Sequence, residues 1–131
     1  MNKIRKLATF LMTSLLLSSC AKSDTGKGYR EISTDEAAIM MKEETNYIIL
    51  DVRRADEFAE KHIPGAINVP NEVIGDSEIP ELPDKSQLIL VYCRSGRRSK
   101  EASEKLVKLG YTNIVEFGGI LDWKGATVSG N

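Results

Sequence analysis

Cys93 lies between an apolar segment and a basic loop that contains glycine. The loop reads Cys93-Arg94-Ser95-Gly96-Arg97-Arg98-Ser99. A turn between a strand and a helix points backbone N–H groups at a bound anion, and the helix N-terminus adds positive potential. Gly96 permits the positive φ that such a turn often needs. With any guanidinium that faces the site, these groups stabilise thiolate over thiol, so the pattern predicts a nucleophile at neutral pH.

Two structural alternatives exist for the same residues. A free cysteine after an apolar strand is commonly a buried, inert small hydrophobe. The basic loop favours a functional thiol, because three arginines beside an inert thiol bring no structural benefit. For the arginines, the alternative is a solvated helix start, and we expect one of Arg94, Arg97 and Arg98 to be only that.

Two apolar, β-branched segments predict the centre of a sheet, at residues 46–52 and 87–92, and the second runs directly into Cys93. Further predicted elements are a helix that follows a cap at Ser33, helices at 55–61 and 99–109, short strands at 66–70 and 113–117, and a loop with one helical turn at 71–85. Strands that alternate with helices predict an α/β fold with a parallel sheet covered on both faces. Ligand sites in such sheets lie at the carboxyl ends of strands, where Cys93 is expected.

The N-terminus has the pattern of an export signal. Residues 2–6 include the basic Lys3, Arg5 and Lys6, and the apolar run at 7–17 is shorter than the roughly 20 residues that span a bilayer. Residues 1–19 are therefore predicted to be a signal peptide. The segment Leu17-Ser18-Ser19-Cys20 resembles the lipobox of bacterial lipoproteins, which implies cleavage before Cys20 and lipidation of its thiol. The alternative is an ordinary secretory signal with a chance cysteine.

Residues 20–29 are polar and contain glycine, so they predict a flexible linker, and residues 30–131 form the predicted domain. We expect the domain to be tethered by lipid to a membrane of the cell envelope, facing the periplasm or the cell exterior. Ala21, after the lipidated cysteine, favours the outer membrane in a cell with two membranes.

Composition excludes several classes of function. Without Lys3, Arg5 and Lys6 of the signal, the chain has 15 basic and 19 acidic side chains, a formal charge near −4, which argues against nucleic-acid binding. The single histidine, His62, cannot complete a standard structural zinc site, and we expect neither a metal nor a cofactor. A disulfide between Cys20 and Cys93 is the less favoured alternative for the two cysteines.

Four segments in order resemble the rhodanese-like sulfurtransferases. They are Leu50-Asp51-Val52-Arg53, His62 to Asn68, Cys93 to Ser99, and Phe117 to Trp123. The resemblance spans about residues 30 to 125. Together with the lipobox-like segment, it makes the chain similar to a single-domain rhodanese made as a lipoprotein. The resemblance implies a three-layer α/β/α fold with a central, mainly parallel sheet.

The resemblance also implies an activity and its residues. Sulfane sulfur would pass from thiosulfate, or a similar small anionic donor, to a thiol or cyanide acceptor. A thioredoxin-like protein is one candidate for the thiol acceptor. Cys93 would be the nucleophile that carries a persulfide, and the amides from Arg94 to Arg98, including Ser95 and Gly96, would hold it. Arg94 with Arg97 or Arg98 would attract the donor.

Other matched positions have structural roles in this interpretation. Asp51 and Arg53 would form an ion pair or hydrogen-bond network beneath the loop. His62 would fix a turn rather than act as a base, and Gly118-Gly119 would form a turn. Lys61 departs from the family, which often has glycine before this histidine, and we expect only a small local change.

Two other functions stay open. Cysteine phosphatases and arsenate reductases place an arginine after the cysteine and five further residues, and here that position is Ser99. The shorter cradle favours a sulfur atom over a tetrahedral oxyanion. A non-catalytic tethered module that binds a partner or senses redox state through Cys93 is the alternative of a different class.

Overall fold

The structure is a computed structural model that describes residues 26–131. The predicted signal peptide at 1–19, the lipidated Cys20 and most of the predicted linker lie outside the described residues. Tyr29, the last residue of that linker, is 2% exposed and packs in the core. Tyr29 is therefore part of the packed domain.

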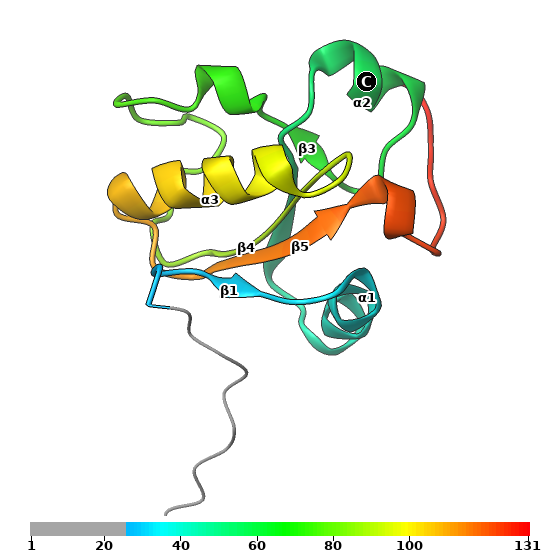
Figure 1. Cartoon of the computed structure of the whole chain (residues 1–131), viewed down its shortest axis with the longest axis horizontal. Helices are drawn as coiled ribbons and strands as arrows, with labels where there is room; N and C mark the ends of the chain where they lie inside the picture. Colours follow the sequence, from blue (N-terminus) through cyan, green and yellow to red (C-terminus); the bar gives the residue numbers. More distant parts are fainter. Residues whose placement is uncertain (1–25) are drawn as a thin grey trace, which may run out of the picture.

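The domain is built on one five-stranded parallel sheet with the strand order β1-β5-β4-β2-β3 (Figure 1). The strands are β1 (Arg30–Glu31), β2 (Tyr47–Asp51), β3 (Ile67–Asn68), β4 (Leu88–Cys93) and β5 (Ile114–Gly119). The long apolar strand β4 is central, as its sequence predicts, because it is buried on both faces. This confirms the α/β class and the parallel sheet.

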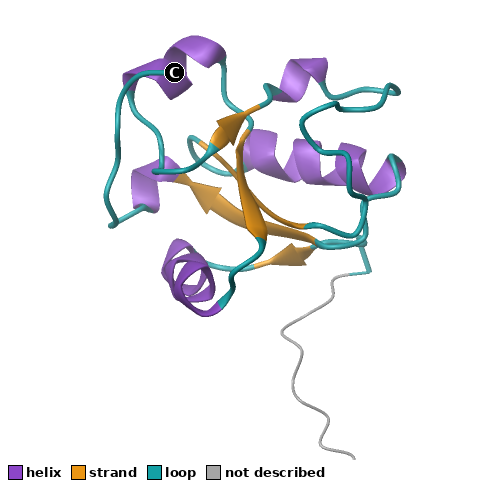
Figure 2. Cartoon of the chain, turned by 180° about the vertical axis from the view of Figure 1, so that it is seen from behind, coloured by secondary structure: helices purple, strands orange, loops and turns teal. Residues whose placement is uncertain are grey.

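Helices lie on both faces of the sheet, as the two views show (Figures 1 and 2). They are α1 (Thr34–Glu43), α2 (Ala55–Glu60) and α3 (Arg97–Lys108), with short 3₁₀ turns η1 (Asn71–Val73) and η2 (Ile120–Asp122). Side chains of β4 alternate between two buried clusters. Ile89, Val91 and Cys93 join the cluster under α3, whereas Leu90 and Tyr92 join the cluster under α1.

Local sequence sets the ends of α1 and α3. The Ser33 hydroxyl accepts a hydrogen bond from the Glu36 N–H at 3.1 Å, which is the predicted cap of α1. At the end of α3, Gly110 has a φ of 97°, and the Tyr111 N–H donates to the Leu106 carbonyl at 3.1 Å. This is a Schellman ending, and it confirms Gly110 as the helix stop.

The structure moves two predicted boundaries and adds one strand. The α3 helix starts at Arg97, two residues before the predicted start, because Gly96 turns the chain directly from the loop into the helix. The pair Gly118-Gly119 belongs to β5 and is not a turn, since Gly119 pairs with Cys93 beyond a shift of register. Strand β1 is a two-residue strand that the sequence analysis did not predict.

The C-terminal segment returns across the domain to α2. His62 and Val128 form an antiparallel bridge, and the Gly130 N–H donates to the Ala59 carbonyl at 2.8 Å. Within residues 26–131, no helix has the length and apolar character needed to cross a membrane.

Candidate active site

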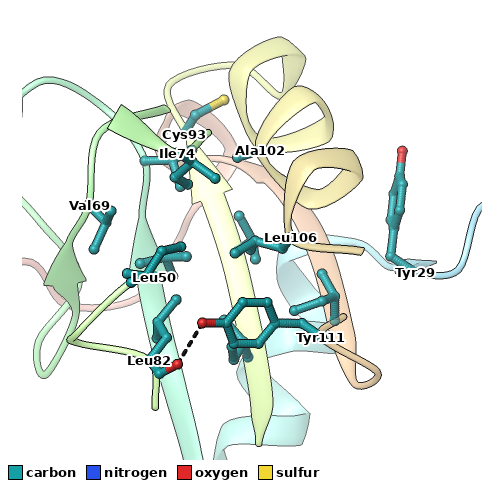
Figure 3. Packing of buried hydrophobic residues seen from close by; sticks show 14 residues of the cluster. Tyr29, Leu50, Val69, Ile74, Leu82, Cys93, Ala102, Leu106 and Tyr111 are labelled. Atoms are coloured by element: carbon teal, nitrogen blue, oxygen red, sulfur yellow. Dashed lines mark hydrogen bonds between the residues drawn. The ribbon is translucent and has the colours of Figure 1, made fainter. Parts of the chain in front are cut away.

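The Cys93 thiol lies at the carboxyl end of β4, beside the start of α3 (Figure 3). Cys93 has no disulfide partner within residues 26–131 and is 1% exposed. The Gly96 N–H donates to its Sγ at 3.0 Å, and Gly96 has a φ of 118°, a conformation that favours glycine. The loop thus directs a backbone amide at the sulfur, as the sequence predicts.

The N-terminus of α3 adds to this positive environment. The first amides of a helix have no acceptor within the helix, and the helix dipole places partial positive charge there. Because α3 begins at Arg97, the amides of Arg97 and Arg98 belong to this first turn. The partial positive charge at this end of α3 would stabilise an anionic group at Cys93.

Strand β5 and η2 brace the loop from one side. The Leu121 N–H donates to the Arg94 carbonyl at 3.2 Å. A Cβ atom at Gly119 would lie 2.0 Å from the same carbonyl oxygen, so only glycine fits there. Gly119 therefore allows the close approach of two backbone segments, a role that the predicted turn at 118–119 did not include.

Behind the sulfur lies a buried chain of polar side chains. The Cys93 thiol donates to the Ser99 Oγ at 3.4 Å, and the Ser99 hydroxyl donates to the Glu116 Oε1 at 2.6 Å. The Gly118 N–H donates to the same Oε1 at 2.7 Å. Ser99 is 0% exposed and Glu116 is 2% exposed. Burial raises the pKa of the Glu116 carboxyl, and the hydrogen bonds from Ser99 and Gly118 offset part of that effect.

The three arginines of the loop have different surroundings. The Arg98 guanidinium forms two hydrogen bonds with Glu57 of α2, at 2.7 and 3.1 Å, and both side chains are mostly buried. Those bonds raise the pKa of Arg98 and lower the pKa of Glu57. Arg97 pairs with Glu101 along the helix and is 74% exposed, so it fits the solvated helix start. Arg94 is exposed, and no ion pair or side-chain hydrogen bond of it occurs within residues 26–131.

Asp51 and Arg53 form the ion pair expected from the sequence. The Arg53 Nη2 lies 2.6 Å from the Asp51 Oδ2, and the two side chains are 5% and 0% exposed. The Arg53 Nη2 also donates to the Lys61 carbonyl at 2.6 Å, which ties the end of β2 to the end of α2. Arg53 and Lys61 also line the open cavity beside the Cys93 loop.

His62 has structural contacts. Its Nδ1 lies 2.7 Å from the Phe58 carbonyl, and its ring stacks on the Phe58 ring at 3.7 Å. These contacts suit a residue that fixes the turn. Lys61, where the family often has glycine, has a φ of −164°, an extended conformation that any residue adopts. The departure at Lys61 therefore causes no backbone strain.

An open cavity forms the mouth above the loop. Six cationic and three acidic side chains line it, together with Ser95, Ile120 and Leu121: Arg53, Arg54, Lys61, Arg94, Arg97 and Arg98, with Glu57, Glu60 and Glu72. The excess of cations favours an anionic ligand. Within residues 26–131, no cluster of side chains suits a metal ion.

Fold and site together define an α/β protein with a buried cysteine at the end of its central strand, under a cationic mouth. The sequence did not predict Glu116 or the partner of Arg98, and it assigned Gly119 to a turn. Only Glu116 left a local signal, because it is an acid inside an otherwise apolar strand.

Comparison with known proteins agrees with this class. Residues 33–126 match the family model described as the rhodanese-like domain. The chain is 37% identical over 73 residues to thiosulfate sulfurtransferase PspE of Escherichia coli, covering 56% of this chain and 70% of that protein. It is 32% identical over 102 residues to thiosulfate:glutathione sulfurtransferase of Saccharomyces cerevisiae, covering 68% and 73%.

A solved structure shows the same fold. A rhodanese with anions from E. coli superposes with a TM-score of 0.59 and 34% identity, covering 64% of this chain and 99% of that one. The chain belongs to the rhodanese-like domain family. It is a sulfurtransferase of the rhodanese type.

Proposed function

We propose that Cys93 takes sulfane sulfur from thiosulfate or a similar anionic donor, holds it as a persulfide and passes it to a thiol or to cyanide. The observation that carries the proposal is the Cys93 Sγ, which accepts a hydrogen bond from the Gly96 amide at 3.0 Å beside the N-terminus of α3. The names of the relatives, which include thiosulfate and glutathione, support the choice of donor and of a thiol acceptor.

The proposed reaction has two balanced steps. First, the Cys93 thiolate forms a bond to the sulfane sulfur of thiosulfate while the bond between the two sulfur atoms of the donor breaks. Sulfite leaves with the electron pair, and the persulfide carries one negative charge. Second, the acceptor attacks the outer sulfur, and Cys93 leaves as a thiolate. With cyanide the product is thiocyanate, and with a thiolate it is a new persulfide.

The donor would enter through the cationic mouth. Arg94 has no competing ion pair within the described part of the chain, so its guanidinium is available to a dianion. Arg98 is held by Glu57 and adds its charge near the sulfur from a fixed position. We assign Arg94 to donor binding and Arg98 to the electrostatic environment of Cys93.

Steady-state transfer from thiosulfate to cyanide tests this activity directly. The wild-type protein should form thiocyanate with saturation in both substrates, and Cys93→Ala should form none. A panel of acceptors that includes glutathione and a reduced thioredoxin would identify the preferred thiol. No thiocyanate from a folded wild-type protein would refute the proposal.

A phosphatase or arsenate reductase fits the site less well. The position where those proteins need arginine is Ser99, whose side chain is 0% exposed and donates to the buried Glu116. Without an arginine at this position, the loop lacks the guanidinium that would pair with a phosphate or arsenate. Assay of a phosphate ester should give no turnover.

The alternative of a redox-sensing or binding module makes a separate prediction. Such a module would not retain sulfur on Cys93 after exposure to thiosulfate, although its thiol could still be oxidised by peroxide. Cys93 is 1% exposed, which disfavours partner binding through the thiol itself. Mass spectrometry after each treatment distinguishes the two functions.

We also propose that the protein is a lipoprotein of the cell envelope, anchored through Cys20. The support is the sequence of residues 1–20 alone, with its basic start, apolar run and lipobox-like end. Full-length protein should incorporate a labelled fatty acid and partition into detergent. Cys20→Ala should abolish the label, and label retained in Cys20→Ala would refute the anchor.

A further inference from the structure

Glu116 is a buried carboxyl that the proposed transfer reaction does not use. It lies on β5 between Val115 and Phe117, which face the cluster under α1, so Glu116 faces α3. Buried acids are costly unless they are paired or neutral. Within residues 26–131 Glu116 forms no ion pair, and its Oε1 accepts hydrogen bonds from Ser99 and Gly118.

The Ser99 hydroxyl connects this carboxyl to the reactive sulfur. Its Oγ lies 3.4 Å from the Cys93 Sγ and 2.6 Å from the Glu116 Oε1. A hydroxyl can accept from one neighbour and donate to the other, and it can reverse both bonds by rotating. The three groups therefore form a continuous path for a proton through a region closed to solvent.

We propose that Cys93 and Glu116 share one proton through the Ser99 hydroxyl, so that Glu116 takes up the proton when Cys93 becomes a thiolate. The thiol proton moves to the Ser99 oxygen while the Ser99 proton moves to the Glu116 carboxylate. Thiol plus carboxylate becomes thiolate plus carboxylic acid, and no proton or charge is lost. Glu116 acts through Ser99 and is thus a positioning residue for the proton.

The shared proton avoids two negative charges in the same buried region. A thiolate or persulfide next to a buried carboxylate would place two negative charges in one dry region. With a shared proton, the pair keeps a single negative charge throughout. That charge is on Glu116 when Cys93 is a thiol, and on sulfur when Cys93 is a thiolate or carries a persulfide.

Other charged groups act on the pair but do not replace the shared proton. Burial raises the pKa of Glu116, which brings it toward the range in which a thiol titrates. The further groups are Lys100 of α3, Glu31 of β1 and Tyr29 near Glu116, and Arg98 near Cys93. Lys100 and Arg98 favour the negative charge of the pair, whereas Glu31 opposes it.

The test is a pH titration of the Cys93 thiolate in the absence of a sulfur donor. The inference rests on the proposed role of Cys93 as a thiolate nucleophile, but this titration is independent of transfer activity. Thiolate is followed by its ultraviolet absorbance and by the rate of alkylation with iodoacetamide. Groups that share a proton titrate as a pair, so the wild-type thiolate should form in two steps instead of one.

Glu116→Gln should convert the titration into a single step. Glutamine has the shape of glutamate and keeps an oxygen for Ser99 and Gly118, but it cannot take up the proton. The matched control is Ser103→Ala, because Ser103 is another fully buried serine on α3 whose hydroxyl donates to the Ser99 carbonyl rather than to Glu116. Ser103→Ala should keep both steps.

A second measurement on the wild-type protein does not depend on any variant. The infrared C=O band of protonated Glu116 should decrease in the same two steps in which thiolate increases. A single thiolate step in the wild-type protein, or two steps that persist in folded Glu116→Gln, would overturn the proposal. If transfer fails but the two steps are present, the proposed function is wrong and the shared proton stands.

Discussion

The two sides of the Cys93 loop are built in contrasting ways. The inner side, formed by the Asp51–Arg53 pair, Gly119 and Glu116, is buried and closely packed. The outer side, represented by Arg94 and Arg97, is exposed to solvent. Persulfide chemistry needs both, because a sulfur atom must be protected while a charged donor must enter.

Substitutions on the two sides of the loop should therefore have different effects. Unpaired charges and steric conflicts inside a packed region are expensive, whereas exposed charges are screened and partly redundant. Changes to the inner side should therefore lower both stability and transfer. Changes to the outer side should alter donor binding and leave the fold intact.

The strongest test of the inner side is Asp51→Ala. It leaves the Arg53 guanidinium buried without its carboxylate, and we expect a loss of about 3–5 kcal/mol in the free energy of unfolding. Urea denaturation measures this loss. Asp56→Ala is the matched control, because it breaks an exposed pair with Arg54 and should leave the midpoint unchanged. Equal losses of unfolding free energy in the two variants would contradict the expected difference between the buried and the exposed ion pair.

Gly119→Ala tests the close approach behind the loop. The new Cβ would meet the Arg94 carbonyl, so the loop must move, at a cost of about 1–3 kcal/mol in unfolding free energy and with most transfer activity lost. Gly75→Ala is the control, since a Cβ there meets open space and Gly75 has no positive φ. Full activity of Gly119→Ala would show that the contact does not hold the loop.

Two carboxyl groups of the site should change the stability of the fold in opposite directions as the pH rises. The hydrogen bonds from Arg98 lower the pKa of Glu57 below its ordinary 4.5, so Glu57 stabilises the fold above that value, and this contribution is lost as pH falls through the lowered pKa. Burial raises the pKa of Glu116 above 4.5, so stability is complete below 4.5 and decreases as pH rises through the raised pKa.

Denaturation at a series of pH values should reveal both effects. Relative to Glu57→Gln, the wild-type protein should gain stability as pH rises toward 4.5. Relative to Glu116→Gln, it should lose stability as pH rises above 4.5. Stability differences that change in the same direction with pH for both variants would contradict the contrast between the paired Glu57 and the unpaired Glu116.

The smallest effects should come from the outer arginines. Arg94→Gln should lower kcat/KM for thiosulfate by about tenfold, mainly through KM, because it removes one charged contact to the donor. Arg97→Gln should change it by less than about twofold, since Arg97 is largely solvated and paired with Glu101. Both variants should unfold like the wild-type protein. A larger loss of kcat/KM in Arg97→Gln than in Arg94→Gln would assign donor binding to Arg97 instead of Arg94.

Sequence patterns predicted the parts of the fold that depend on local periodicity. Strand β4 was evident from its apolar run, and α3 from its apolar positions and the stop at Gly110. The Cys93 loop followed from its place between them. The two-residue strand β1 was missed, because it is defined by pairing with β5 and not by a pattern of its own.

The parts that could not be predicted depend on contacts between distant segments. The Arg98–Glu57 pair joins residues 41 positions apart, and nothing near either residue marks the other as its partner. Gly118-Gly119 suggested a turn, because paired glycines usually mark one. The structure places Gly119 in a strand instead, since its lack of a side chain lets β5 approach the loop.

The most direct test of the central claim is the mass of the protein after incubation with thiosulfate and removal of excess donor. The wild-type protein should gain one sulfur atom, located on Cys93 by peptide analysis and removed by cyanide with release of thiocyanate. Cys93→Ser should show no gain. A wild-type protein that gains no sulfur, or a gain that persists in Cys93→Ser, would refute sulfur transfer through Cys93.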